Sequence, residues 1–500
     1  MKKHLVIGLL LANAAAFAVA PKPSYYQQVN NLAPFSSEAT SYKWTSEAEV
    51  RALKTAFSKS KRTPSNSAAG DESMMSEAFR QTRDRFLKIK TADELETFLV
   101  EFDVTFDSLK DNDQKFFVSQ VLPLKELRGI VWRSQPVFSQ AKVTHSLVLT
   151  AIKSAVSQVK IFLPTEQWQA GLDYVTLPYV RNGLLSQPFK NEADLIAHTA
   201  GPVRAALLKA AQRIQKIDLK DQPIVWDNKL AFGTASFLDN VDRFRLVGEV
   251  ERLSSLAAIH STLAQITYQR AYSSENGIKL AQDMGKLYGV DGILSQVDGA
   301  PSQKRVQVLR RPAFANYGVL VEDGEKWMKL SFQHLQESVR LTSAIWSQIK
   351  AEDRPLTEAF VFDTSFARAY ERGSDLAIAN MEAMVAGRAK IRSGVTGETV
   401  VVDLPAFYQN PPRDLKEFLP TAFQQGSEWQ TVNLTDGSGK VHKVKARNYE
   451  IGRGVDWKAD AYGIIFPEMK SGKDVPRNVR ILSQSWGTWI SALPLADVIE

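Results

Sequence analysis

The chain has 500 residues, with 62 Lys and Arg against 55 Asp and Glu, a formal net charge of +7 and no cysteine. The absence of thiols excludes disulfides, cysteine nucleophiles, thiolate zinc sites and cysteine-ligated iron–sulfur clusters. A chain of this length can bury enough apolar area to fold without cross-links, and a small positive charge without a dense basic tract does not predict nucleic-acid binding.

The first twenty residues have the three-part layout of a secretory signal peptide: two lysines, an apolar run and small residues ending at Ala20. We therefore expect residues 1–20 to be removed on export, leaving a periplasmic or secreted chain of net charge +5, because the two lysines supply 2 of the +7. Pro21 is unfavourable directly after a cut, so cleavage after Ala16 or Ala18 is an alternative. An uncleaved anchor is another alternative, although the run is shorter than the ~20 apolar residues that span a bilayer. No later segment is predicted to cross a membrane.

Residues 21–73 are expected to add little to a packed core. The part up to residue 44 is rich in Pro, Ser, Asn and Gln and is predicted to be an extended lead-in. A short helix is predicted from Ser46 to about Lys61, and the small polar residues of 58–73 have the composition of a flexible linker.

Residues 74–393 show helical periodicity and form the predicted helical domain, either as one body or as two subdomains. Thr91 and Glu94 make a capping-box pattern before an apolar face that begins at Leu95. A second apolar stripe runs through the predicted helix 324–349. Further helices are predicted at 112–133, 141–162, 192–216, 246–271, 275–287 and 364–390. Two alternating apolar segments interrupt them: 223–232, and 305–321, where a hairpin would turn near residues 312–316.

The pattern changes after Gly394 to short alternating segments separated by glycines. Strands are predicted in GETVVVDLP (397–405), WQTVNL (429–434), KVHKVKARNY (440–449) and NVRILSQSWGTWIS (478–491). We therefore assign residues 394–500 to a smaller α+β or β-rich C-terminal domain. The predicted fold class of the whole chain is mainly α, with an irregular multi-helix body.

The sequence TDGSGK at 435–440 resembles a phosphate-binding loop at first sight. A Walker A loop requires a glycine five residues before its Gly-Lys pair and Ser or Thr after the lysine. Leu434 and Val441 occupy these two positions, so both requirements fail. Asp436-Gly437 and Gly439 instead suit a hairpin turn between the two flanking strands.

This hairpin would carry a basic face. Lys443, Lys445 and Arg447 alternate along the second strand, close to Lys440 at the turn. One interpretation is a surface that contacts an anionic polymer or a lipid headgroup. The other is that the lysines protect an exposed edge strand from pairing with other chains.

The densest candidate site lies between residues 449 and 474. Asp456, Asp460 and Glu468 could supply an acid and a base for glycoside hydrolysis. Trp457 and Tyr462 could form an apolar platform for a sugar or a partner, and Trp486 and Trp489 could extend it. The alternative is that the aspartates belong to turns and the aromatic rings to a small core.

Other catalytic and metal-binding patterns are absent from the sequence. The histidines form no HExxH or HxxxH pair, and His260 lies on an apolar helical stripe, which favours a partly buried, hydrogen-bonded core residue. No GxSxG elbow or acidic calcium loop is present, and no SxxK opens a helix together with its usual companion motifs. We therefore predict no cofactor and no metal.

Two functional hypotheses remain. The first is an exported, non-catalytic binding or scaffold protein of the cell envelope, whose partner is a protein or an anionic envelope polymer. The second is a hydrolase of envelope carbohydrate of the peptidoglycan type that uses the C-terminal carboxylates.

Overall fold

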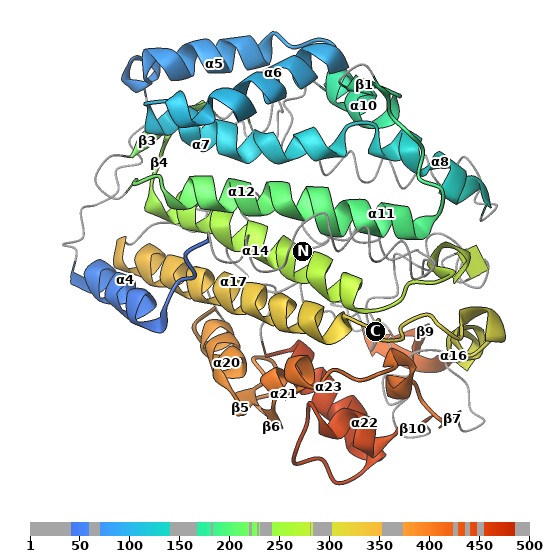
Figure 1. The fold of residues 1–500 in the computed structure, drawn as a ribbon. Coiled ribbons are helices and arrows are strands. Elements are labelled where there is room, and N and C mark those ends of the chain that lie inside the picture. The colour runs from blue at the N-terminus through green and yellow to red at the C-terminus, as the bar shows by residue number, and fades with distance from the viewer. Residues whose placement is uncertain are drawn as a thin grey trace. The chain divides into compact units, whose positions relative to one another are not determined.

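We describe the fold from a computed structural model (Figure 1). The structure describes residues 42–59, 71–140, 168–181, 184–219, 223–227, 230, 243–280, 282–283, 303–352, 374–423, 429–435, 441–447 and 455–485. The predicted signal peptide, the lead-in up to residue 41, most of the predicted linker and the helix predicted at 141–162 lie outside these residues.

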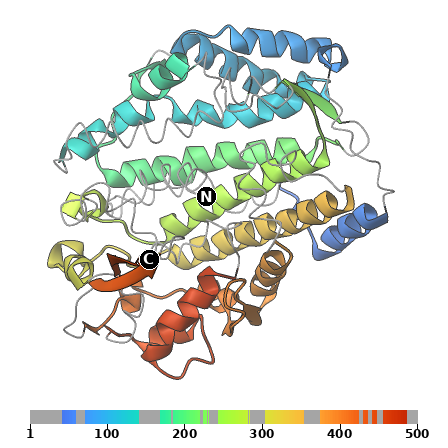
Figure 2. The ribbon, with the colours of Figure 1, turned by 180° about the vertical axis from the view of Figure 1, so that it is seen from behind.

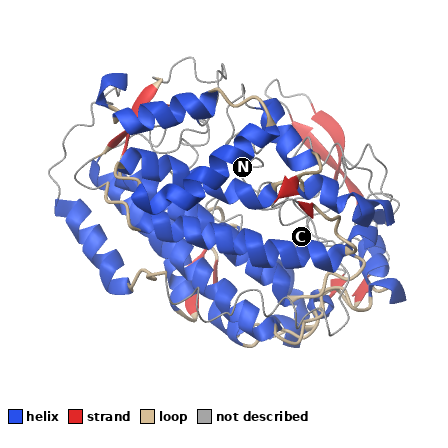
Figure 3. Cartoon of the chain, turned by 45° about the horizontal axis from the view of Figure 1, so that its top comes forward, coloured by secondary structure: helices blue, strands red, loops and turns tan. Residues whose placement is uncertain are grey.

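Contacts divide the chain into two compact units. The first comprises Met1–Arg270 and Leu330–Arg372, and the second comprises Ala271–Lys329 and Gly373–Glu500. The units group residues by their contacts and do not test where a folding domain begins or ends along the chain. The domain boundaries predicted at residues 74 and 394 therefore stay predictions. Helices predominate among the described residues and the strands are short (Figure 3), which confirms the mainly α fold class. None of the described helices is long and apolar enough to cross a membrane.

The first unit is a set of helices with two small antiparallel sheets (Figures 1 and 2). Its α-helices are α4 (Glu47–Lys59), α5 (Glu77–Leu87), α6 (Ala92–Thr105), α7 (Asn112–Val121), α8 (Ile130–Gln140), α10 (Trp168–Thr176), α11 (Glu192–His198), α12 (Arg204–Gln215), α14 (Glu249–Ala271) and most of α17 (Gly324–Glu352). Its strands are β1 (Val180–Arg181) paired with β2 (Leu184–Leu185), and β3 (Ile224–Asp227) paired with β4 (Phe244–Val247).

Local sequence signals set several of these helices. The predicted capping box is present at the start of α6: the Thr91 side chain accepts from the backbone of Glu94, whose carboxylate accepts from the backbone of Thr91. The helix predicted over 112–133 is not continuous, because a 3-10 helix (Leu122–Leu127) that contains Pro123 follows α7 and Gly129 then takes φ +61°. Residues 192–215 are helical throughout, with a π-helical turn (Thr199–Val203) between α11 and α12.

Aromatic side chains fill the core between α5, α6, α7 and β3. The rings of Phe86 and Phe98 lie 5.2 Å apart, and Phe117 lies 5.1 Å from Phe86 and 5.8 Å from Trp226. These rings are fully or almost fully buried, as the apolar face predicted for α6 requires. Offset and edge-on contacts of this kind stabilise a core beyond the burial of area alone.

Helices α14 and α17 run antiparallel beside each other. Hydroxyl groups join them at two levels: Ser331 donates to the carbonyl of Ala264 at 2.7 Å, and Ser338 donates to that of Ala257 at 3.0 Å. The apolar stripe predicted for 324–349 is confirmed on α17, where Met328, Leu335 and Val339 are buried. Between the two serine contacts, this pair of helices holds the histidines described below.

The second unit combines short helices with two-stranded antiparallel sheets. Its helices are α16 (Gln303–Leu309), α20 (Ser374–Ala386), α21 (Leu404–Gln409), α22 (Ala459–Gly463) and α23 (Val475–Ser483), with 3-10 turns at Pro312–Phe314, Leu415–Phe418 and Gly472–Asp474. Its strands pair as β5 (Ala389–Arg392) with β6 (Thr399–Val402), β7 (Ala422–Phe423) with β10 (Val455–Asp456), and β8 (Trp429–Thr435) with β9 (Val441–Arg447). The strands predicted near residues 400, 430 and 444 are therefore confirmed.

Two predictions for this unit are wrong. The hairpin predicted at 305–321 is instead α16 followed by the 3-10 turn Pro312–Phe314. Val306, Val308 and Leu309 are all buried there, so the apparent alternation reflects a short helix that is covered on more than one side.

The strand predicted at 478–491 is wrong over its described part, because Val475–Ser483 forms α23. A capping box between Ser471 and Asp474 precedes this helix, and Pro476 occupies its first turn, where proline is tolerated. The buried positions Val475, Asn478 and Ile481 then follow at helical spacing.

Candidate functional site

The aromatic residues predicted as a surface platform lie in the interior of the second unit. Tyr462 is 0% exposed, and its hydroxyl donates to the carbonyl of Phe418 at 2.9 Å. The ring of Trp457 meets that of Tyr462 edge-on at 5.7 Å and is 8% exposed. Burial raises the pKa of Tyr462 above its ordinary range. In this arrangement the two rings pack a core, and Trp486 and Trp489 lie outside the described residues.

The candidate carboxylates are distributed over separate elements. Asp456 is the last residue of β10, opposite Ala422 of β7. Asp460 is exposed in the first turn of α22. Glu468 is also exposed and accepts from Arg388 at 2.9 Å. Among the residues that the structure describes, no group of three or more acidic or histidine side chains could hold a metal ion.

The hairpin that carries the predicted basic face is present as β8 and β9. Their antiparallel register places Asn433 opposite Lys443, Thr431 opposite Lys445 and Trp429 opposite Arg447. Directly opposed residues share a face of a sheet, and every second residue along a strand returns to that face. The three basic positions of β9 therefore share one face. Lys440 and the rest of the turn lie outside the described residues.

The first unit contains a buried polar cluster centred on Glu337 of α17. The Glu337 side chain is 0% exposed. Its carboxylate accepts from the hydroxyls of Tyr42 at 2.9 Å and Thr45 at 2.6 Å, and from the Thr45 backbone N–H at 3.0 Å. Burial raises the pKa of Glu337, and the hydrogen bonds from Thr45 and Tyr42 oppose this shift without cancelling it. The segment Tyr42–Thr45, which we call the latch segment, is thereby fixed to α17.

Two histidines meet beside the latch segment. His260 of α14 and His334 of α17 are each 0% exposed, and their Nδ1 atoms lie 2.9 Å apart. Because one nitrogen must donate and the other accept, the two neutral imidazoles share a single N–H in this contact. The Nε2 atom of each ring is buried without a hydrogen-bond partner. The sequence interpretation of His260 as a hydrogen-bonded core histidine is therefore confirmed, but the ring is fully buried where partial burial was expected.

Aromatic rings of the latch segment cover this pair. The Tyr42 ring lies 4.6 Å from the His260 ring, and the Trp44 ring lies 5.6 Å from His260 and 5.1 Å from His334. Burial lowers the pKa of His260 to about 3. Burial also lowers the pKa of His334, and repulsion from a protonated His260 and from Arg204 adds to that shift. Both rings are therefore neutral at pH 7.

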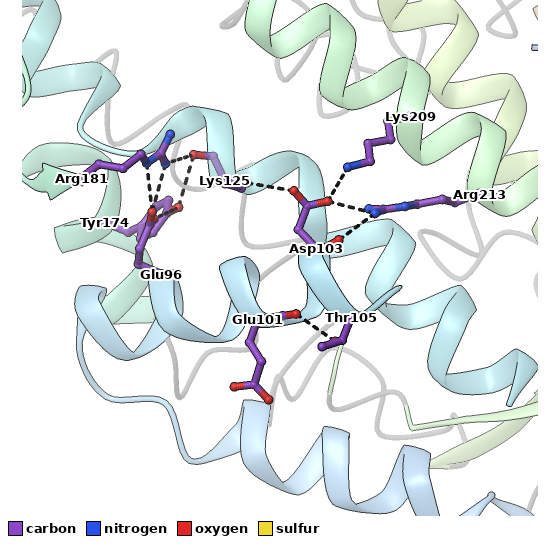
Figure 4. Close-up of polar contacts among 9 residues, drawn as sticks. All are labelled: Glu96, Glu101, Asp103, Thr105, Lys125, Tyr174, Arg181, Lys209 and Arg213. Carbon is purple, nitrogen blue, oxygen red and sulfur yellow. Dashed lines mark hydrogen bonds and ion pairs between the residues drawn. The ribbon is translucent and has the colours of Figure 1, made fainter. Parts of the chain in front are cut away.

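A separate ionic network surrounds Asp103 of α6 (Figure 4). Its carboxylate accepts from Lys209 at 2.8 Å, from Arg213 at 2.9 Å and from Lys125 at 2.9 Å. Burial by itself raises the pKa of Asp103, but the hydrogen bonds from Lys209 and Lys125 outweigh it and hold that pKa below its usual range. One carboxylate thus ties α6 to α12 and to the 3-10 helix after α7.

A second acidic residue of α6 organises a neighbouring contact in the same view. The Glu96 carboxylate accepts from the Tyr174 hydroxyl at 2.7 Å and from Arg181 at 3.1 Å, while Arg181 also donates to the Lys125 carbonyl at 2.9 Å (Figure 4). Burial and the nearby Glu96 charge raise the pKa of Tyr174. Both Glu96 carboxylate oxygens and the Tyr174 hydroxyl have a protein partner, so this contact joins α6, α10 and β1.

Sequence reasoning did not find the histidine pair or the Glu337 cluster. His260 and His334 are 74 residues apart, whereas the motifs searched for require close spacing. The sequence of α17 does contain a pattern that indicates such contacts. His334 and Glu337 share a helical stripe with the buried Leu341, and polar residues on a buried stripe require hydrogen-bond partners.

Comparisons with known proteins give no relative for this chain. No family model matches it, and neither a curated protein nor a solved structure matches it.

Proposed function

We propose that the chain is an exported, non-catalytic envelope protein that binds an anionic envelope polymer through the basic face of the β8–β9 hairpin. The register of the hairpin supports this proposal, because it gathers Lys443, Lys445 and Arg447 on one face of a seven-residue strand. Three positive charges at a two-residue spacing match a polymer that carries repeated carboxylates. The export itself rests on the signal-peptide layout of residues 1–20.

The hydrolase alternative has weaker geometric support. An acid–base pair needs two carboxylates at a controlled separation beside an open platform for the sugar. Glu468 is exposed and paired with Arg388, and Asp460 is exposed on α22. The rings of Trp457 and Tyr462, which would have formed the platform, are buried.

The test is retention of the full chain on purified peptidoglycan. The variant K443E/K445E/R447E reverses the basic face, and K88E/K90E/K110E makes the same charge change at exposed lysines of the first unit. Each basic residue near an anionic surface contributes about 1 kcal/mol, so losing three weakens binding by roughly 100-fold. We expect the hairpin variant to lose retention and the control to keep it.

Equal retention of the two variants, or no retention of the unaltered chain, would overturn the proposal. Soluble fragments released from the same peptidoglycan would instead favour the hydrolase. Light scattering of the neutral variant K443T/K445T/R447T tests the protective role of the basic residues, because a variant that has lost only edge protection self-associates while its retention stays unchanged.

A further inference from the structure

We propose that the latch segment Tyr42–Thr45 is an acid-sensitive latch, which releases from α14 and α17 when the His260–His334 pair takes up a proton. The proposal is independent of the hairpin and of any polymer. It rests on how the segment is held, on what covers the imidazoles and on which charges surround them.

The latch segment is held by side-chain contacts that can break without unfolding a helix. Three hydrogen bonds join it to the Glu337 carboxylate, and Arg340 donates to the Thr45 carbonyl at 3.3 Å. On its exposed side, Lys43 pairs with Glu49 of α4 at 2.5 Å. Helix α4 begins two residues after the segment, so release of the latch frees the attachment of α4 as well.

The imidazole pair has no place for an added positive charge while the latch is closed. The pair already shares its Nδ1 hydrogen, so a further proton must be placed on a buried Nε2 atom that has no acceptor. An unpaired buried charge is strongly disfavoured, because the protein does not replace the water that would solvate it. The rings of Tyr42 and Trp44 lie against the histidines, and Trp44 itself is partly exposed. Movement of these two rings would admit water to the imidazoles.

Titratable and charged groups from each packed element decide whether a fall in pH opens or closes the latch. Among the described residues they are Tyr42 and Lys43 in the latch segment, Arg204 on α12, Glu249 and Arg252 on α14, and Glu337 and Arg340 on α17. Arg252 is paired with Glu249 at 2.6 Å. Arg204 disfavours the imidazolium form of His334. Glu337 titrates in the opposite direction to the histidines, because its pKa is raised in the closed form and its protonation therefore favours closure.

The pH window follows from the histidines. Their folded pKa values are depressed, so their contribution to closure is complete above about pH 6.5 and is lost as the pH falls below it. An imidazole that regains its ordinary pKa of about 6.5 in the open form shifts the equilibrium toward opening by about 30-fold at pH 5 for each proton. Protonation of Glu337 opposes this shift toward the open form, but only in the pH range in which the Glu337 carboxyl itself titrates.

The absence of cysteine from the chain permits a clean reporter. Val50 of α4 is 5% exposed, whereas Ala52 on the same helix is exposed. The single-cysteine variants V50C and A52C are labelled with dithiodipyridine, which reacts with thiols in acid. The measured quantity is the labelling rate of V50C divided by that of A52C, because this ratio cancels the intrinsic pH dependence of the thiol. We expect the V50C/A52C ratio to rise at least tenfold between pH 7 and pH 5 while far-UV circular dichroism stays unchanged.

Removal of the titrating groups provides the control. The variant H260F/H334F keeps the packing but cannot take up the proton, so its labelling ratio should stay flat with pH. If this variant does not fold, H260Q/H334Q supplies neutral polar side chains at the same positions. A flat ratio in the unaltered histidine background, a rise that persists in the histidine variant, or labelling that accompanies loss of circular dichroism would overturn the proposal.

Discussion

Replacing Asp103 by Asn tests whether the ionic network of Figure 4 holds the first unit together. The substitution keeps the size of the side chain but removes the charge that accepts from Lys125, Lys209 and Arg213. Three cations would then face one another around a neutral amide. The side chains of Arg213 and Lys125 are 10% and 25% exposed, so water screens their repulsion only in part.

The expected loss can be built up from the three partners. The Arg213 contact is largely buried and charge-assisted, which is worth about 1.5–3 kcal/mol. Lys125 is partly buried and adds ~0.5–1 kcal/mol, whereas the half-exposed Lys209 adds at most ~0.5 kcal/mol. We therefore expect D103N to lower the free energy of unfolding by about 2–4 kcal/mol.

The measurement is urea unfolding of the full chain, followed by tryptophan fluorescence at pH 7. Glu101 on the same helix offers a matched control, because its two bonds to Arg85, at 2.7 and 2.6 Å, join two side chains that are more than 40% exposed. E101Q should cost no more than ~1 kcal/mol. Equal losses in D103N and E101Q would show that partial burial does not decide the strength of the network and would refute the reasoning.

The pH dependence of D103N provides a second readout of the same contact. The pKa of Asp103 is lowered in the folded state, so its stabilisation is present above its unfolded pKa of about 3.9 and is lost as the pH falls below that value. The difference between the unaltered chain and D103N should therefore shrink below pH 4. A difference that stays constant down to pH 3 would point to lost packing instead of lost charge.

Two further predictions concern the neighbouring helices. Gly129 has φ +61°, and an added Cβ would lie 2.7 Å from the Tyr179 ring, so G129A should lower the free energy of unfolding by about 1–3 kcal/mol. At Gly201 nothing lies within 4 Å apart from the adjoining residues, and the helix gain of alanine is opposed by the ring of Pro202, so G201A should change the free energy of unfolding by less than ~0.5 kcal/mol. Thermal unfolding of the two variants checks the contrast, and a G129A variant as stable as G201A would contradict it. Burial and the nearby Arg133 lower the pKa of His198 to about 4, while its Nε2 atom lies 2.7 Å from the Glu126 carbonyl. The contribution of His198 to stability is complete above pH 6.5 and should fall by about 2 kcal/mol by pH 5. The variant H198Q should therefore lose less stability than the unaltered chain over this pH range in urea titrations. An unchanged pH dependence would contradict the attribution of this loss to His198.

Local patterns in the sequence were sufficient where a single element satisfies its own hydrogen bonds. The capping box at Thr91 and the apolar stripe of α17 predicted their helices, because both depend on residues three or four positions apart. The antiparallel pairing of β8 with β9 agrees with the strands predicted on either side of the turn, and the turn itself lies outside the described residues. The absence of cysteine followed directly from composition and excluded whole classes of chemistry.

Short apolar segments could not be assigned without their neighbours. Val306 and Val308 alternate like a strand, yet α16 is buried on more than one side, so period alone does not distinguish the two structures. The same ambiguity affected Val475–Ser483, where the cap that precedes the helix decides the outcome. Trp457 and Tyr462 are residue types that often form binding platforms, and their burial in a core follows from tertiary packing that the sequence pattern does not show.

The sequence by itself therefore determined the mainly α class, the long helices, the basic strand and the chemistry that a cysteine-free chain excludes. Tertiary structure alone brought His260 to His334 and Tyr42 to Glu337, contacts that span 74 and 295 residues. The physical reason is that a helix stripe records which residues are buried, whereas the partner of a buried polar group depends on which other helix covers that stripe.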